Sequence, residues 1–124
     1  MPQFPPQPIH GVAWVDRHEA RLFLLKGDGS TPGEPDHRIH RQKDSGPVRD
    51  DREFFEEILA ALEPVESWTI AGPDSTRHDL EKYLDGHAEE LRGKLLGVEA
   101  MDQPSPSDLA ARARAFAAAV ERSS

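Results

Sequence analysis

The sequence predicts an α/β protein in which three main helices cover a mixed sheet of about five strands. Residues 10–16 are apolar on both sides of an extended chain, which is typical of a covered central strand. A second apolar run, residues 20–25, follows after a turn too short for a parallel crossover. Beyond residue 50, segments with helical periodicity alternate with short apolar runs, which indicates a sheet with helical connections.

The first two strands form an antiparallel hairpin in this interpretation. The segment HGVAWVD, residues 10–16, places Val12 and Trp14 on one face and Ala13 and Val15 on the other. The segment ARLFLL then pairs with it across a short turn.

The next part of the chain has the composition of a loop. Residues 26–35 read KGDGSTPGEP, which is rich in glycine and proline. A third short strand is predicted around residues 37–41, and residues 44–47 interrupt the chain again. The sheet therefore gains an outer strand just before the first helix.

The first helix is predicted to begin at Asp50, with Glu53 at the capping-box spacing. Pro64 ends it, because the residue before a proline avoids helical geometry. Its apolar stripe consists of Phe54, Phe55, Ile58, Leu59 and Leu62.

Two further strands and two further helices follow. Residues 67–71 and 95–98 are short apolar strands, and a Gly-Pro turn stops the first of them. Asp74 or Ser75 caps the second helix, and residues 105–108 start the last one. The predicted inner stripes are Leu80, Tyr83, Leu84, His87 and Leu91, then Leu109, Ala113, Phe116, Ala117 and Val120.

The element order and the doubly apolar first strand predict the sheet order. The first strand belongs at the centre, between the second strand and the strand at residues 67–71. The resulting order 3-2-1-4-5 is the ribonuclease-H-like topology.

Composition limits the classes of protein that this chain can represent. It has 124 residues, no cysteine and a net charge of −8, so disulfides, thiolate zinc sites and a generally basic nucleic-acid coat are excluded. Residues 1–9 read as a proline-rich tail, and residues 10–124 as one domain. No apolar run is long enough to span a membrane, and the start is not a secretory signal. We expect a cytoplasmic protein without a cofactor.

Three carboxylates are predicted at the carboxyl edge of the parallel strands. Asp16, Asp74 and Asp102 follow the first, fourth and fifth strands, and could hold divalent metal ions for phosphodiester cleavage. The plainer interpretation is stronger, because Asp74 is a natural helix cap and Asp16 begins a hairpin turn.

The turn before the second helix is a further candidate site. Gly72, Asp74 and Ser75 precede a helix start, where free backbone N–H groups suit an anion. An ordinary strand-to-helix turn is the more common case, and the phosphate-loop motifs are absent.

One basic segment stands out on the acidic chain. Arg38, His40, Arg41 and Lys43 lie between residues 37 and 49, against Asp44 alone. The pair His37 and His40 lacks a third ligand and is a poor zinc signature. Guanidinium groups bind phosphate bidentately, so this segment indicates a phosphate contact surface; a solvated loop is an equally open alternative.

Two stretches resemble the central domain of archaeal and eukaryotic peptide-chain release factors and of the ribosome-rescue factor Pelota. They are HGVAWVDRHEARLFLL, residues 10–25, and IAGPDSTRHDLEKYL, residues 70–84. The whole is similar to small bacterial relatives known as translational machinery proteins, or release-factor-like proteins, over about residues 10–120.

The resemblance implies the ribonuclease-H-like fold and a partner such as the ribosome or tRNA. In release factors a Gly-Gly-Gln loop before the first long helix triggers peptidyl-tRNA hydrolysis. The matching residues 37–46 contain Gln42 without a preceding Gly-Gly pair. Peptide release is therefore not implied, whereas RNA contact through this loop is.

These observations favour a non-enzymatic, translation-associated binding module. Two alternatives stay open: a metal-dependent nuclease of the ribonuclease-H type, and a protein-interaction domain whose partner recognises the acidic helices.

Overall fold

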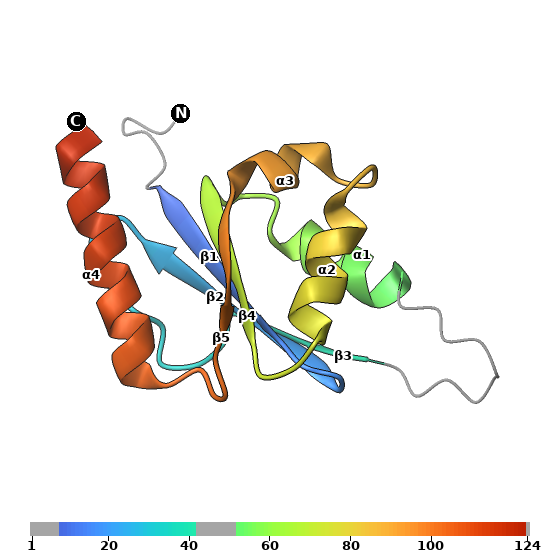
Figure 1. Ribbon diagram of the computed structural model, residues 1–124. Helices are drawn as coiled ribbons and strands as arrows, with labels where there is room; N and C mark the ends of the chain where they lie inside the picture. The colour runs from blue at the N-terminus through green and yellow to red at the C-terminus, as the bar shows by residue number, and fades with distance from the viewer. Residues whose placement is uncertain (1–7, 42–51, 124) are drawn as a thin grey trace, which may run out of the picture.

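A five-stranded mixed sheet forms the centre of the molecule (Figure 1). The structure, a computed structural model, describes residues 8–41 and 52–123. The strand order is β3-β2-β1-β4-β5, which confirms the predicted order 3-2-1-4-5. The strands are β1 (Ile9–Val15), β2 (Glu19–Lys26), β3 (His37–His40), β4 (Ser67–Gly72) and β5 (Leu95–Ala100).

The first strand lies at the centre of the sheet, as its sequence predicts. It pairs antiparallel with β2 and parallel with β4. Val12 and Trp14 are buried on one face, and Ala13 and Val15 on the other. A strand covered on both faces needs apolar side chains at consecutive positions, which is why this segment shows no polar alternation.

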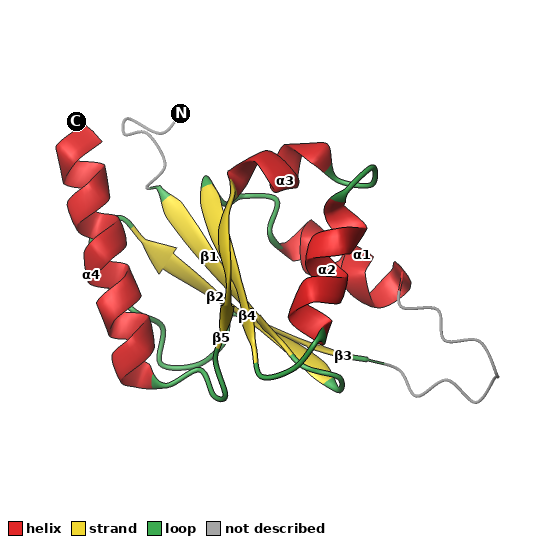
Figure 2. Cartoon of the chain, viewed as in Figure 1, coloured by secondary structure: helices red, strands yellow, loops and turns green. Residues whose placement is uncertain are grey.

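The helices cover the two faces of the sheet unequally (Figure 2). On one face lie three of them, and the fourth lies on the other. The first three are α1 (Arg52–Ala61), α2 (Thr76–Leu84) and α3 (Glu89–Lys94), and the fourth is α4 (Pro106–Ser123).

The apolar stripes of the helices produce two separate cores. The larger core, between the sheet and α1–α3, includes Trp68, Ile58, Leu62, Ile70 and Leu80. The smaller core, under α4, consists of Val12, Trp14, Phe23, Leu25, Ala71, Leu109 and Ala113. Burial of this apolar surface is the main term that stabilises each layer.

The structure corrects the predicted second helix. The chain does not continue in one helix from Leu80 to Leu91, because α2 ends at Leu84 and Gly86 adopts a φ of 81°. This left-handed conformation suits glycine and terminates the helix. His87 is exposed in the turn, and Leu91 belongs to the short α3.

Smaller differences concern element boundaries. The predicted tail extends too far, because Ile9 already belongs to β1 and the Pro8 carbonyl accepts a hydrogen bond from Gly27 N–H (2.9 Å). Residues 1–7 lie outside the described residues, as does the predicted cap Asp50. In α4 the outer part of the predicted stripe, Phe116, Ala117 and Val120, is only partly buried. None of the helices that the structure describes is long and apolar enough to cross a membrane.

Candidate functional site

Asp16 closes the turn between β1 and β2. Its Oδ1 atom accepts hydrogen bonds from the backbone N–H groups of His18 (2.7 Å) and Glu19 (2.8 Å). An aspartate that binds backbone donors two and three residues ahead is an ordinary turn-forming residue. The carboxylate therefore has a local structural role.

Asp74 lies one residue before the N-cap of α2 and connects the start of this helix to the hairpin. Its Oδ1 accepts from Thr76 N–H (2.9 Å), and its Oδ2 accepts from Arg17 N–H (3.3 Å) and lies 3.8 Å from the Arg17 guanidinium. Burial alone would raise the pKa of Asp74, but the hydrogen bonds from Thr76 and Arg17 and the charge of Arg17 lower it below its usual value.

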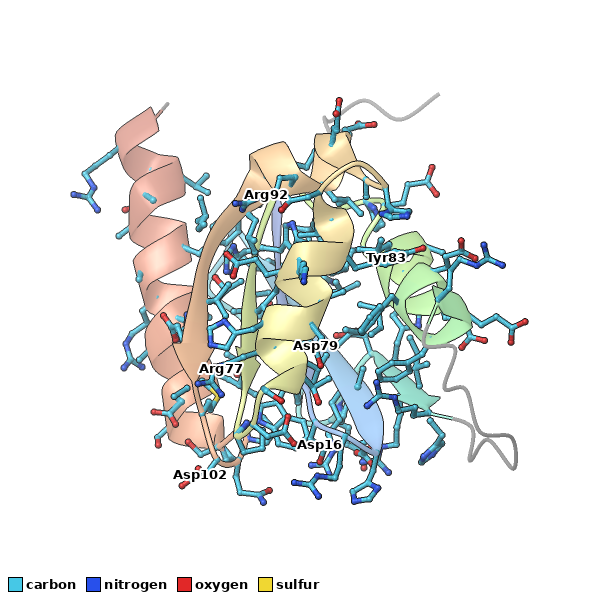
Figure 3. All side chains as sticks on the ribbon, turned by 45° about the vertical axis from the view of Figure 1, so that its right-hand side comes forward. Asp16, Arg77, Asp79, Tyr83, Arg92 and Asp102 are labelled. Atoms are coloured by element: carbon cyan, nitrogen blue, oxygen red, sulfur yellow. The ribbon has the colours of Figure 1, made fainter. Side chains whose placement is uncertain are left out.

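The structure does not bring the three predicted carboxylates together as a metal site. Figure 3 shows Asp16 and Asp102 at one edge of the sheet, on different elements. Across residues 8–41 and 52–123, no three histidine, aspartate or glutamate side chains form a group that could hold a metal ion. The structure therefore gives no support to the predicted metal site at Asp16, Asp74 and Asp102, because the carboxylates of Asp16 and Asp74 accept hydrogen bonds from backbone N–H groups.

Side chains of the protein already bind the backbone groups of the predicted anion-binding turn. Thr76 N–H donates to Asp74, and the Arg77 guanidinium donates to the carbonyls of Gly72 (3.3 Å) and Asp74 (2.7 Å). Ser75 stands at the N-cap without a side-chain hydrogen bond. An anion at Gly72, Asp74 and Ser75 stays a prediction that this arrangement does not favour, because a carboxylate already holds the turn.

The basic segment begins as a strand. Arg38 and His40 are exposed on β3, where Arg38 lies opposite Arg21 and His40 lies opposite Glu19. Because directly opposite residues share one face, Arg38, His40 and Arg21 project to the same side of the sheet.

Arg41 points to the other side of the sheet. Its N–H donates to the His18 carbonyl (2.9 Å), and its guanidinium donates to the Arg17 carbonyl (3.3 Å) and lies 5.3 Å from the ring centre of Phe54. The expected single loop is therefore corrected, because strand alternation separates Arg41 from Arg38 and His40. Lys43 lies outside the described residues.

Sequence reasoning missed Arg17 and Arg21. Arg17 sits in the β1–β2 turn with a side chain that is 69% exposed, next to the end of β3. We call Arg17, Arg38, His40 and Arg41 the basic edge, because they lie on the outer strand β3 or directly beside it. The signal for Arg21 was a charged residue inside the otherwise apolar run ARLFLL.

His10 is a buried polar residue beneath α4. Its ring nitrogens lie 2.8 Å from Ser67 Oγ and 3.2 Å from Thr69 Oγ1, and its ring packs against Phe116 at 5.5 Å. Burial, with a smaller effect of the Arg112 charge, lowers the pKa of His10 to about 4. The neutral imidazole therefore belongs to the core, where each of its ring nitrogens has a hydrogen-bond partner.

Several solved structures share this fold, and three archaeal proteins are among them. Pelota from Archaeoglobus fulgidus matches 94% of this chain with a TM-score of 0.62 and 17% identity. Pelota from Thermoplasma acidophilum matches 82% with a TM-score of 0.60 and 20% identity. The archaeal translation termination factor aRF1 matches 92% with a TM-score of 0.56 and 20% identity.

The likeness confirms the resemblance at the level of the fold. This chain spans 32%, 30% and 38% of those three structures, so it corresponds to about a third of each. No protein-family model matches the sequence, and no curated protein matches it.

Proposed function

We propose that this chain is a non-enzymatic, translation-associated binding module that contacts the RNA backbone of the ribosome or of tRNA through the basic edge. The observation that carries the proposal is the fold likeness to Pelota and to the archaeal termination factor, which extends over nearly the whole chain. Fold alone does not determine function, so the residues of the basic edge must supply the chemistry.

The chemistry of the basic edge supports phosphate contact. Arg38 is exposed, Arg17 is exposed in the adjoining turn, and the backbone of Arg41 is fixed by its hydrogen bond to His18. Guanidinium groups bind phosphate oxygens bidentately and remain charged at every physiological pH. With a net charge of −8, the chain as a whole repels RNA, so we expect contact where basic side chains are grouped.

The sequence argues against peptide release as the activity. It contains no Gly-Gly pair at any position, so the release motif of termination factors has no counterpart. A non-enzymatic role therefore accounts for both the fold and the missing motif. The nuclease alternative has no comparable support, because the three carboxylates do not form a metal-binding group.

Sedimentation with purified ribosomes tests the proposal. The wild-type protein should enter the ribosomal pellet at low salt and leave it as the salt concentration rises. Replacement of Arg17 and Arg38 by alanine should weaken binding at least about tenfold, since charge-assisted hydrogen bonds each contribute about 1.5–3 kcal/mol.

A matched variant controls for loss of charge. Lys82 and Arg114 are exposed on α2 and α4, away from the basic edge. Their joint replacement by alanine removes the same charge and should leave sedimentation unchanged. Equal binding of both double variants, or a wild-type protein that stays in the supernatant at low salt, would refute the proposal.

A groove between α1 and α2–α3 favours protein interaction as a second candidate function. The groove has a volume of about 510 Å³, an apolar floor that includes Leu59 and Leu91, and the stacked rings of Tyr83 and His87 (4.4 Å). Figure 3 shows Tyr83 pointing from α2 toward α1. Carboxylates line it at Glu56, Glu63 and Glu90.

The acidic groove predicts a partner segment with apolar and basic side chains. A labelled amphipathic peptide rich in leucine and lysine should bind the wild-type protein more tightly than a variant with Glu63→Lys and Glu90→Lys. Equal binding of the two proteins would remove this second candidate. Fluorescence anisotropy measures both affinities.

A further inference from the structure

Two arginines face each other across the outer strand pair. Arg21 on β2 and Arg38 on β3 are direct partners in the antiparallel register. Side chains at such positions start about 5 Å apart on one face of the sheet, and like charges there destabilise the pairing. The protein nevertheless has an arginine at both of these positions.

Only one of these charges is balanced within the described part of the chain. Arg21 forms an ion pair with Glu19 and lies 5.2 Å from the ring centre of Trp14, with a side chain that is 30% exposed. Arg38 is exposed, and none of the described residues forms an ion pair with it. An anion between the two guanidinium groups would convert the repulsion into attraction.

The two arginines line a cavity of about 400 Å³. Phe23 and Leu109, both buried, belong to its lining, so one part of the wall is apolar. The loop between β2 and β3 contributes Thr31 and Gly33 to the lining. Convergent charged groups beside an apolar wall are typical of a ligand site.

We propose that this cavity binds a phosphate group carried by a nucleotide or an RNA chain, with Arg21 and Arg38 as its two ligands. Two guanidinium groups can each donate paired hydrogen bonds to phosphate oxygens. The cavity is larger than a phosphate ion, so a sugar or a base can lie against Phe23 and Leu109.

The inference deepens the proposed function and rests on it in one respect, because Arg38 also belongs to the basic edge. It adds Arg21, which lies outside that edge, and a defined ligand group. Binding of phosphate alone is independent of any ribosome, so the two proposals can fail separately.

Nearby acidic groups set the strength of the site. Glu34 lines the same cavity and is exposed, and Glu19 pairs with Arg21. His40 also projects to this side, opposite Glu19. Because a carboxylate repels phosphate, Glu34→Gln should tighten binding about threefold, while loss of an arginine should weaken it much more.

Titration with inorganic phosphate, in a buffer of constant ionic strength, tests the site. Nuclear magnetic resonance of the arginine side-chain N–H groups should show saturable shifts at Arg21 and Arg38. Arg38→Gln should raise the dissociation constant at least about tenfold, and Arg38→Lys by less, because lysine keeps the charge without the paired donors. Arg114→Gln, on α4, is the matched control and should bind like wild type.

Arg38 is the residue to replace because its side chain is exposed and its loss leaves both cores intact. Arg21 covers Trp14, so its replacement tests folding as well as binding. Arg21→Lys keeps the charge over the ring, and its folded state is checked by circular dichroism before titration. A folded Arg21→Lys protein should bind phosphate several-fold more weakly.

Short RNA distinguishes the two sources of phosphate. If a 5′-phosphorylated tetranucleotide binds more tightly than its unphosphorylated counterpart, the cavity takes terminal phosphate. If the two tetranucleotides bind equally well and Arg38→Gln weakens the binding of both, the cavity takes a phosphate of the internal RNA backbone. Both results support the proposal.

Absence of saturable phosphate binding to the wild-type protein would overturn the site, as would equal binding by the wild type and Arg38→Gln. Ribosome sedimentation that persists in either case would leave the proposed function standing. Conversely, phosphate binding without sedimentation would retain the cavity and reject the ribosomal role.

Discussion

The two faces of the sheet differ in how completely helices cover them. Behind α1–α3 the face is closed by a large core that contains the fully buried Trp68. On the opposite face α4 is alone, and a helix about 10 Å wide covers about two strands spaced about 4.8 Å apart. Both flanks of that face therefore stay open, with cavities of about 400 Å³ beside β3 and about 310 Å³ beside β5.

The difference indicates where chemistry can be placed. The closed face carries stability, and polar side chains such as His10, Arg21 and Arg112 gather on the face that α4 covers incompletely. Leu96, which is 71% exposed, lines the open flank beside β5. A partly covered face can hold ligand-binding groups without interrupting the main core.

Loss of the largest side chain on the closed face should have the largest effect. Trp68→Ala removes a fully buried ring and its hydrogen bond to the Leu91 carbonyl (2.7 Å), and should lower the free energy of unfolding by about 3–5 kcal/mol. Leu109→Ala, beside the open cavity under α4, should cost about 2 kcal/mol, at the low end for a buried leucine. Urea denaturation measures both, and a larger loss for Leu109→Ala would contradict the comparison.

Two glycines provide a matched test of close packing. A Cβ atom at Gly72 would lie 2.1 Å from the Val15 carbonyl oxygen, whereas one at Gly97 would meet nothing within 4 Å. Gly72→Ala should lower the free energy of unfolding by about 3 kcal/mol, at the upper end for overpacking, because the backbone at Val15 would have to move. Gly97→Ala should change stability by less than about 1 kcal/mol. Thermal unfolding of both variants checks this, and equal melting temperatures would refute it.

The buried histidine under α4 should make stability depend on pH. The pKa of His10 is lowered to about 4, so the folded state disfavours the proton that the unfolded chain accepts near pH 6.5. The neutral His10 ring contributes its full share to the free energy of unfolding above about pH 6.5. This share is lost as the pH falls toward 4, by up to about 3 kcal/mol. Denaturation from pH 7 to 4 should show this loss in the wild type and in His18→Gln, whose histidine is exposed, but not in His10→Gln.

Much of the fold was predictable because the sheet centre has a strong signal. Consecutive buried residues in HGVAWVD admit only a covered strand, and the short turn to the next strand requires an antiparallel pair. The break at Gly86 was missed, although Asp85-Gly86 is a turn dipeptide. The apolar spacing from Leu80 to Leu91 obscured it.

The candidate site was less predictable, because it depends on register. The sequence indicated Arg38, His40 and Arg41, but a short strand carries them to two faces. The opposition of Arg21 and Arg38 follows from the pairing of β2 and β3, which no local pattern determines. Asp16 is the turn residue that the sequence indicates, whereas Asp74 accepts a hydrogen bond at the start of α2 and Ser75 holds the N-cap position. The metal site built on these aspartates does not form among the described residues.

The dependence of ribosome binding on salt is the most direct test of phosphate contact at the basic edge. The logarithm of the binding constant falls linearly with the logarithm of the salt concentration. Each phosphate contact with single-stranded RNA contributes about −0.7 to the slope. We predict a negative slope for the wild-type protein that becomes shallower by about 1.4 when Arg17 and Arg38 are replaced by alanine, one contact per arginine. An identical slope in the two proteins would contradict the account.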